Sequence, residues 1–355
     1  MNKNTLDVIG SFVDQLFLVP GRVFAHFEAK REMDWDAHAR EVSFYLEQGY
    51  VEKPLNFFTI PEKEPEFQIR KQTAYQEGFY QEISFESLYE PRNPFVRQRY
   101  LHYTENRTGY LIRWTHGDKP LKTVLCVHGF MMGSPREAER MFKVSKLFSM
   151  GLDVALCIHP FHWKRIAGPR SARHVYLTLG DTAFTNECVG QSVYDLHNVF
   201  LILKKLGTED IGMIGASLGG YITGIYACLN AQLKFAAMMV PAFSLIRPIT
   251  PDYFYSRSPF DLNWQANAKR AAEFHSALNL KPKLSPDDIL VVASRGDQLC
   301  PFELVDELRK RWQLTRCHYR TGGHWLVFDK IRGRAWYSFL QEKKFIDVKK
   351  DSVKV

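Results

Sequence analysis

The sequence predicts an α/β fold in which helices cover both faces of a mostly parallel central sheet. Three observations predict this fold class. From about residue 95 onwards, short apolar runs alternate with stretches of helical periodicity. One of these runs leads through a glycine-rich turn directly into a helical stretch, at residues 211–221. The composition of the 355 residues, 45% hydrophobic and 24% charged, is ordinary for a globular protein with a buried core.

Residues 1–90 are expected to form a helical N-terminal extension. Residues 8–19 are largely apolar, but Asp14 and Gln15 interrupt the run, which argues against a signal peptide and a membrane span. We favour a helix that packs on the domain, and the alternative is peripheral membrane contact through this helix. The helix is predicted from the spacing of Leu6, Ile9, Val13, Leu16 and Phe17.

Residues 91–345 are expected to form the α/β domain, and residues 346–355 a basic tail. The domain is predicted to begin with an antiparallel hairpin at one edge of the sheet, with strands at 96–103 and 109–114. Buried strands are then predicted at 123–127, 153–158, 211–214, 235–240, 290–293 and 314–319. Helices are predicted at 35–48 in the extension and, in the domain, at 136–150, 188–206, directly after 214 and at 301–312.

A G-x-S-x-G pattern stands at residues 215–219, between an apolar run and a helical stretch. This strand-turn-helix context is that of a nucleophile elbow. A turn tight enough to lift the Ser217 hydroxyl clear of the backbone strains the serine, and a side chain two positions away would clash. Gly215 and Gly219 are therefore expected to be required, and Gly220 to let the helix pass close to the sheet.

The ends of the predicted strands nominate an acid and a base. In an open α/β sheet, ligands bind beyond the carboxyl ends of the strands. Asp297 follows the strand at 290–293, and His324 follows the last strand. Asp261, in the long insertion, is a distant second candidate for the acid. The chain order is therefore Ser217, Asp297, His324.

Four motifs in this order resemble those of the α/β-hydrolase superfamily. They are H-G-F at 128–130, G-A-S-L-G at 215–219, G-D at 296–297 and G-G-H-W at 322–325. Residues 95–340 are similar to little-described bacterial α/β-hydrolase domain proteins of the serine esterase or lipase type. The resemblance implies a nucleophile at Ser217, a base at His324 and an orienting carboxylate at Asp297.

The resemblance also implies an oxyanion hole made of two backbone N–H groups. One belongs to Leu218, directly after the nucleophile, and the other to Phe130. The H-G-F-M sequence has one glycine rather than a run of three, so the choice between Phe130 and Met131 stays open.

Three histidines lie near the predicted site. His128 is interpreted as a histidine packed under the oxyanion turn. His159 and His162 form H-P-F-H after a predicted strand, and metal ligation by them is disfavoured because no cysteine or carboxylate cluster follows. They are interpreted as core or site-wall residues, and with Met131 they are our candidates for substrate contact. No cofactor and no metal are expected.

Two insertions are candidates for shaping the pocket. Residues 161–187 carry basic side chains that either hold an anionic group or are merely solvated. The cap-like insertion at 242–286 is rich in aromatic residues. A cap over the nucleophile favours an apolar acyl or aryl group, but core packing explains the same residues equally well. The residues concerned are Lys164, Arg165, Arg170 and Arg173 in the first insertion, and Phe243, Tyr253, Phe254, Tyr255, Phe260, Trp264 and Phe274 in the second.

These observations predict a serine hydrolase that cleaves a carboxylic ester or thioester, small or lipid-like, through an acyl-enzyme intermediate. An acyltransferase or peptidase is the alternative on the same fold, and a non-catalytic scaffold that binds a partner or membrane is the rival from another class. The net charge of +8 comes without a nucleic-acid motif. Six cysteines without a C-x-x-C pair favour free thiols and a cytoplasmic, or membrane-peripheral, location. Oligomeric state stays open.

Overall fold

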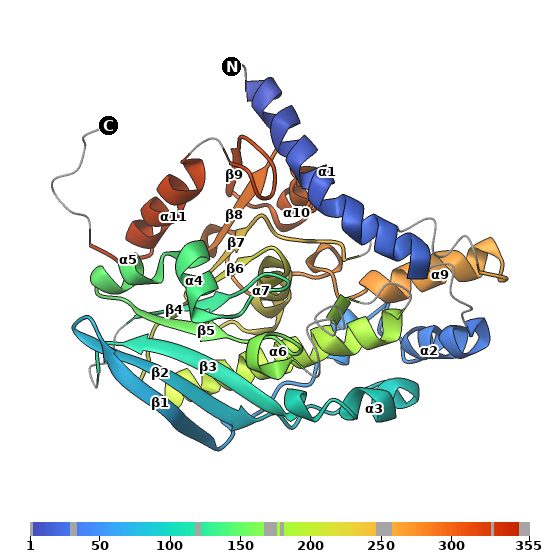
Figure 1. Ribbon diagram of the computed structural model, residues 1–355, viewed down its shortest axis with the longest axis horizontal. Helices are drawn as coiled ribbons and strands as arrows, with labels where there is room; N and C mark the ends of the chain where they lie inside the picture. The colour runs from blue at the N-terminus through green and yellow to red at the C-terminus, as the bar shows by residue number, and fades with distance from the viewer. Residues whose placement is uncertain are drawn as a thin grey trace.

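The architecture is built on a mixed β-sheet with helices on both sides (Figure 1). The computed structural model describes residues 3–28, 34–117, 122–166, 176–177, 181–245, 258–327 and 330–347. Within these residues the sheet has nine strands in the order β1-β2-β3-β5-β4-β6-β7-β8-β9. The strands are β1 (Phe67–Tyr75), β2 (Gly78–Glu86), β3 (Thr108–Thr115), β4 (Thr123–Val127), β5 (Asp153–Cys157), β6 (Ile211–Ala216), β7 (Phe235–Met239), β8 (Ile289–Ser294) and β9 (Arg316–Arg320).

The sheet divides into an antiparallel edge and a parallel centre. β1, β2, β3 and β5 pair antiparallel in turn, whereas β5, β4, β6, β7, β8 and β9 pair parallel. Every residue of β4 to β8 is buried, because helices cover both faces of the parallel part. The carboxyl ends of these parallel strands therefore meet at one edge, where a ligand site is expected.

The helices form two layers with separate apolar cores. One core lies under α2, α6, α7, α9 and α10, and the other under α4, α5 and α11. Described helices are α1 (Lys3–Glu28), α2 (Trp35–Glu47), α3 (Pro94–Leu101), α4 (Pro135–Phe142), α5 (Val144–Ser149), α6 (Thr182–Lys205), α7 (Leu218–Leu229), α9 (Leu262–Glu273), α10 (Phe302–Trp312) and α11 (Ile331–Glu342). None of the helices in the described ranges is both long and apolar enough to span a bilayer.

The predicted strands of the parallel part are confirmed, and so is the edge strand predicted at 109–114, which is β3, but its predicted hairpin partner at 96–103 is wrong. The 1–90 extension is not wholly helical, because β1 and β2 form a hairpin in it that pairs with β3. β1 is exposed along most of its length, so it lacks the apolar alternation that signals a strand. Residues 96–103 are not a strand: Asn93 caps α3, and Pro94 occupies its first turn.

One predicted helix, at 136–150, is two helices. Lys143 ends α4 and begins α5 in the left-handed conformation, with φ of 57°. A non-glycine residue rarely adopts this conformation, and the sequence carries no glycine there to announce the break.

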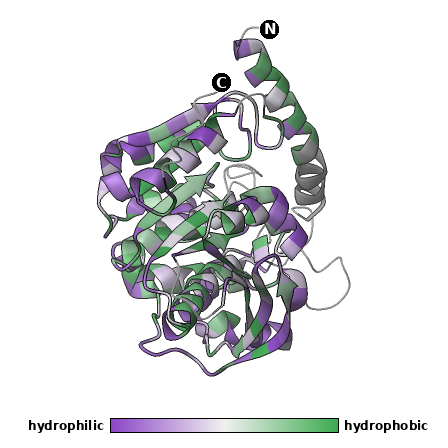
Figure 2. Cartoon of the chain, turned by 90° about the vertical axis from the view of Figure 1, so that its left-hand side faces the viewer, coloured by the Kyte–Doolittle hydropathy of each residue, from purple (hydrophilic) through white to green (hydrophobic). Residues whose placement is uncertain are grey.

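The first helix, α1, packs on the domain, as favoured from the sequence, and in Figure 2 it runs along one side of the molecule with its N-terminal end projecting. The most buried face is not the apolar stripe on which the prediction rested, since Leu6, Ile9 and Val13 of that stripe are only half-buried. Gly10 and Asp14 are buried, whereas Leu16 is 56% exposed. Val8 and Phe12 lie on the same outer face and are 68% and 61% exposed.

The described part of the insertion at 242–286 packs on α2 and α6 instead of standing apart. The ring of Trp264, on α9, lies 6.4 Å from the ring of Trp35, and that of Phe274 lies 5.7 Å from that of Tyr45. Core packing thus accounts for these two aromatic residues. Residues 246–257, which include Tyr253, Phe254 and Tyr255, lie outside the described residues, as do Arg170, Arg173 and the basic tail from residue 348.

Candidate active site

The turn between β6 and α7 has the geometry of a nucleophile elbow. Ser217 has φ of 56° and ψ of −117°, a strained conformation for a residue with a side chain. A Cβ on Gly215 would lie 2.1 Å from the Gly219 carbonyl oxygen, and one on Gly219 would lie 1.9 Å from the Val127 oxygen. A Cβ on Gly220 would lie 2.8 Å from Pro241 Cβ. The predicted steric need for these three glycines is confirmed.

Asp297 and His324 form a buried pair beyond the carboxyl ends of β8 and β9. Asp297 Oδ2 lies 2.7 Å from His324 Nδ1, and the two residues are 3% and 9% exposed. The other carboxylate oxygen accepts hydrogen bonds from the N–H groups of Leu299, at 2.9 Å, and Cys300, at 2.7 Å. Because the carboxylate is held by its own loop, it fixes the orientation of the imidazole.

Cys300 connects this pair to Ser217. Burial and the Asp297 charge raise the pKa of its thiol well above its usual value, and Ser217 is close enough to lower this pKa by a smaller amount. Polar atoms of Asp297, Cys300 and His324 lie within 4.8 Å of one another. In the described part of the chain, no hydrogen bond joins Ser217 directly to His324. Sequence reasoning missed Cys300, which has no motif of its own.

The same three side chains are a donor set that zinc can accept. A metal bound by all of them would compete with His324 for the Asp297 carboxylate, which is already hydrogen-bonded on both oxygens. Among the described residues, the Asp297 carboxylate is thus engaged by three donors, those of His324, Leu299 and Cys300.

The loop after β4 lies beside the elbow and offers a free donor. A Cβ on Gly129 would lie 3.5 Å from Ser217 Cβ. The Met131 N–H donates to His162 Nε2 at 3.1 Å, so it is not free. Among the described residues, the N–H groups of Phe130 and of Leu218, the first residue of α7, have no hydrogen-bond partner. Of the two alternatives left open by the sequence, Phe130 is the one with an available donor.

The buried imidazoles of His128, His159 and His162 lie beside this loop and are hydrogen-bonded to its backbone. His128 donates from Nδ1 to the Gly129 oxygen, at 2.8 Å, and accepts at Nε2 from the His159 N–H, at 3.1 Å. His162 donates from Nδ1 to the Pro160 oxygen, at 2.8 Å. Since carbonyl oxygens only accept, these contacts fix the tautomers. The rings of His128 and His162 lie 5.0 Å apart.

Burial keeps these imidazoles neutral. It lowers the pKa of His128 to about 4, that of His162 to about 3, and that of His159 well below its usual value. His159 and His162 are only 1% and 2% exposed. The sequence left open whether these two histidines lie in the core or at the wall of the site, and this burial places them in the core. Met131, the third candidate for substrate contact, has a side chain that is 49% exposed.

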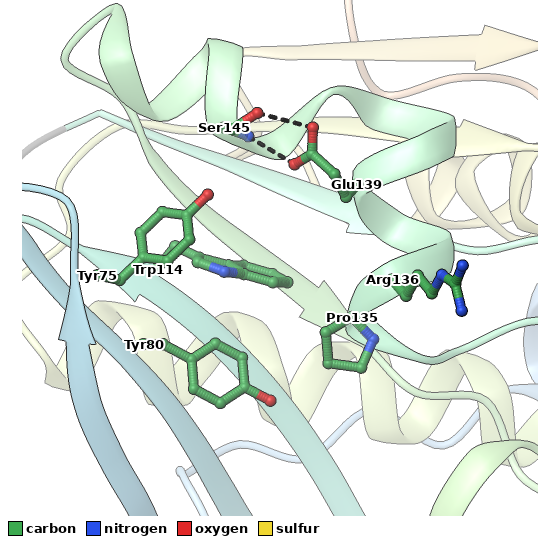
Figure 3. Close-up of a pocket in the computed structure, with 7 residues that line it drawn as sticks. All are labelled: Tyr75, Tyr80, Trp114, Pro135, Arg136, Glu139 and Ser145. Carbon is green, nitrogen blue, oxygen red and sulfur yellow. Dashed lines mark hydrogen bonds between the residues drawn. The ribbon is translucent and has the colours of Figure 1, made fainter.

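A surface hollow of about 460 Å³ lies between the antiparallel edge and α4 (Figure 3). Aromatic side chains from β1, β2 and β3 line one side of it. The Glu139 carboxylate on the other side accepts hydrogen bonds from Ser145 N–H and Oγ, at 2.8 and 2.7 Å. None of the predicted site residues lines it, so it is separate from the elbow. Its lining residues are Tyr75, Tyr80, Trp114, Pro135, Arg136, Glu139 and Ser145.

The mixed sheet with helices on both faces has the architecture of the α/β-hydrolase fold, and solved structures agree. The chain is similar to an acetyl xylan esterase of a Thermoanaerobacterium species, with a TM-score of 0.58, 13% identity, and coverage of 83% of this chain and 93% of that one. An acetyl xylan esterase of a Paenibacillus species gives a TM-score of 0.57 at 13% identity, covering 88% and 95%. The α/β-hydrolase fold predicted from the sequence is confirmed.

Sequence comparison leads to relatives without an assigned activity. Uncharacterised proteins from two strains of Mycobacterium tuberculosis are 28% identical to the chain over 292 residues, which is 81% of this chain and 69% of theirs. No family model matches the chain.

Proposed function

We propose that the protein is a serine hydrolase that cleaves a carboxylic ester or thioester. The observation that carries the proposal is the buried Asp297–His324 hydrogen bond of 2.7 Å, next to a thiol that contacts the strained Ser217. The two solved structures compared above are named as esterases, which supports the reaction class. Fold similarity alone does not carry a function, so the proposal depends on the side chains.

In the proposed reaction, Ser217 Oγ attacks the carbonyl carbon and its proton passes to His324 Nε2. Asp297 accepts from Nδ1 and stabilises the imidazolium that forms. The tetrahedral oxyanion accepts hydrogen bonds from the N–H groups of Phe130 and Leu218. Collapse expels the alcohol or thiol, which takes the proton from His324. Water then attacks the acyl-enzyme by the same route and releases the carboxylic acid.

The proposed placement of the oxyanion hole is supported by the hydrogen bonding of the loop. The Met131 N–H donates to His162, whereas the Phe130 N–H of the same loop has no hydrogen-bond partner among the described residues and is available to an oxyanion. The Gly129 backbone approaches Ser217 closely. A donor that is preorganised in this way needs no rearrangement as charge develops, and the loss of one typically costs about 10²–10³ in rate.

Replacing the nucleophile tests the proposal. Ser217→Ala is expected to abolish turnover of short p-nitrophenyl esters, while the far-ultraviolet circular dichroism and melting temperature stay close to those of the wild type. A fluorophosphonate probe is expected to label the wild type at Ser217 and leave the variant unlabelled. Wild-type protein that takes up no label would favour the non-catalytic scaffold. Product formed with an alcohol acceptor in place of water would indicate acyl transfer.

A further inference from the structure

Helix α1 touches both loops of the acid–base pair through backbone contacts. A Cβ on Gly10 would lie 2.1 Å from the Gly323 nitrogen, and one on Gly296 would lie 2.3 Å from the Asp7 oxygen. Ser11 Oγ donates to the Gly296 oxygen at 2.8 Å. Gly323 directly precedes His324, and Gly296 directly precedes Asp297. The helix is therefore in contact with the backbone next to both members of the pair.

Asp14 of α1 joins the two loops through its carboxylate. Oδ2 accepts from the N–H of His324, at 2.7 Å, and from that of Gln298, at 3.2 Å. Oδ1 lies 3.3 Å from the N–H of Trp325, which donates to it. The residue is 0% exposed. A single side chain thus binds the backbone of the base itself and of the residue that follows the acid.

The charges around Asp14 explain why its geometry matters. Burial raises the pKa of the Asp14 carboxyl, and the Asp297 charge raises it further, while the three backbone N–H donors lower it. Arg320 donates to the His324 oxygen at 3.1 Å, so a cation lies against the same loop. The Asp14 carboxylate accepts from three backbone N–H groups. An amide in its place has only one acceptor oxygen, and its NH₂ group would face backbone donors, so hydrogen bonds are lost.

We propose that Asp14 is a positioning residue that holds the His324 imidazole against the Asp297 carboxylate by fixing the backbone of both loops. The reaction served is the one proposed above, on which this role rests. Asp14 does not touch the reacting atoms in this scheme. Its effect comes through the separation and orientation of two groups whose loops follow different strands, and a misplacement of about 1 Å can cost about 10²-fold in rate.

The test compares two carboxylates on the same helix. Asp14→Asn keeps the size of the side chain but turns an N–H₂ group toward backbone donors. Asp7→Asn is the matched control, because within the described ranges Asp7 Oδ1 accepts from the Gly322 N–H, at 2.8 Å, and has no hydrogen bond with His324. We expect Asp14→Asn to lower kcat by about 10- to 100-fold with KM within about threefold of the wild type. Asp7→Asn is expected to keep kcat within about threefold.

A spectroscopic readout separates this proposal from the proposed function. The proton between Asp297 and His324 gives a downfield NMR resonance that needs no turnover to be observed. We expect it to shift or broaden in Asp14→Asn and to persist in Asp7→Asn. If the wild type has no esterase activity but the resonance still differs between Asp14→Asn and Asp7→Asn, the proposed function is refuted and the positioning role is supported. An unchanged resonance and kcat in folded Asp14→Asn would overturn the positioning role.

Gly10→Ala keeps the test decisive should Asp14→Asn fail to fold. Alanine has a higher helix propensity than glycine, so α1 itself is not weakened. Its Cβ would meet the Gly323 nitrogen, and the helix must move away from the His324 loop. We expect kcat to fall about 10-fold or more while Asp14 is intact. A folded Gly10→Ala variant with wild-type kcat would contradict the proposal.

Discussion

Replacing His162 tests whether the buried imidazoles set the geometry of the loop after β4, which carries Phe130 and Met131. The two nitrogens of His162 have different partners: Nε2 accepts from Met131 N–H, and Nδ1 donates to the Pro160 oxygen. Glutamine places an amide near the position of Nε2, and asparagine places one near that of Nδ1. His162→Gln therefore keeps an acceptor for Met131, whereas His162→Asn keeps only a donor for Pro160.

Both variants are expected to lose a similar amount of stability. His162 is 2% exposed, so each variant leaves one buried backbone group without its partner: the Pro160 oxygen in His162→Gln and the Met131 N–H in His162→Asn. The loss costs about 1–3 kcal/mol. At about 2.1 cal/mol/K per residue, the 355 residues give an unfolding entropy of about 0.7 kcal/mol/K. The melting temperature of either variant should therefore fall by about 1–4 °C.

The catalytic effects are expected to differ. In His162→Asn the Met131 N–H is released and the loop with Phe130 shifts, so kcat should fall by about 10-fold or more, up to the 10²–10³-fold cost of a lost oxyanion donor. His162→Gln should keep kcat within a few-fold of the wild type. The assay is p-nitrophenyl ester turnover with thermal melts of the same samples. Equal kcat values for the two variants would refute the reasoning.

Two further predictions concern titration and reactivity. The free energy of unfolding should fall as the pH drops from 6.5 towards 4. In this window the buried histidines stay neutral in the folded protein, because their pKa values are lowered, whereas they bind protons in the unfolded chain. Each such histidine lowers the free energy of unfolding by about 1.4 kcal/mol per pH unit. Melting temperatures between pH 4 and 8 check this for all histidines with a lowered pKa together, which include His38, His197 and His275 as well as those beside the loop after β4, and a flat profile would contradict it. Cys300, 5% exposed and with a raised pKa, should resist iodoacetamide in the native protein and react after denaturation, as read by mass spectrometry.

The catalytic candidates could be predicted because their signals are local. Gly215, Ser217 and Gly219 lie within five residues, and their spacing reflects a turn whose sterics do not depend on the rest of the chain. Asp297 and His324 each follow a buried strand that is readable from its apolar run. The rule on strand ends then places them at one edge.

Contacts between distant segments could not be predicted in this way. Asp14 lies in a helix whose apolar residues pointed to another face, and its partner His324 is 310 residues away. Cys300 meets Ser217 only when β6 and β8 lie in the same sheet. The choice between Phe130 and Met131 likewise depended on His162, which comes from the loop after a different strand.

The separation of Asp14 and His324 along the chain bears on how the protein is made. A ribosome adding about 5–20 residues per second synthesises His324 about 15–60 s after Asp14, because 310 residues separate them. During that interval the partners of the helix do not yet exist, and its buried face is open to water or to chaperones. If the proposed mechanism holds, a fragment that ends before residue 324 lacks the base, and newly made protein becomes active only after α1 has met the loop that follows β9.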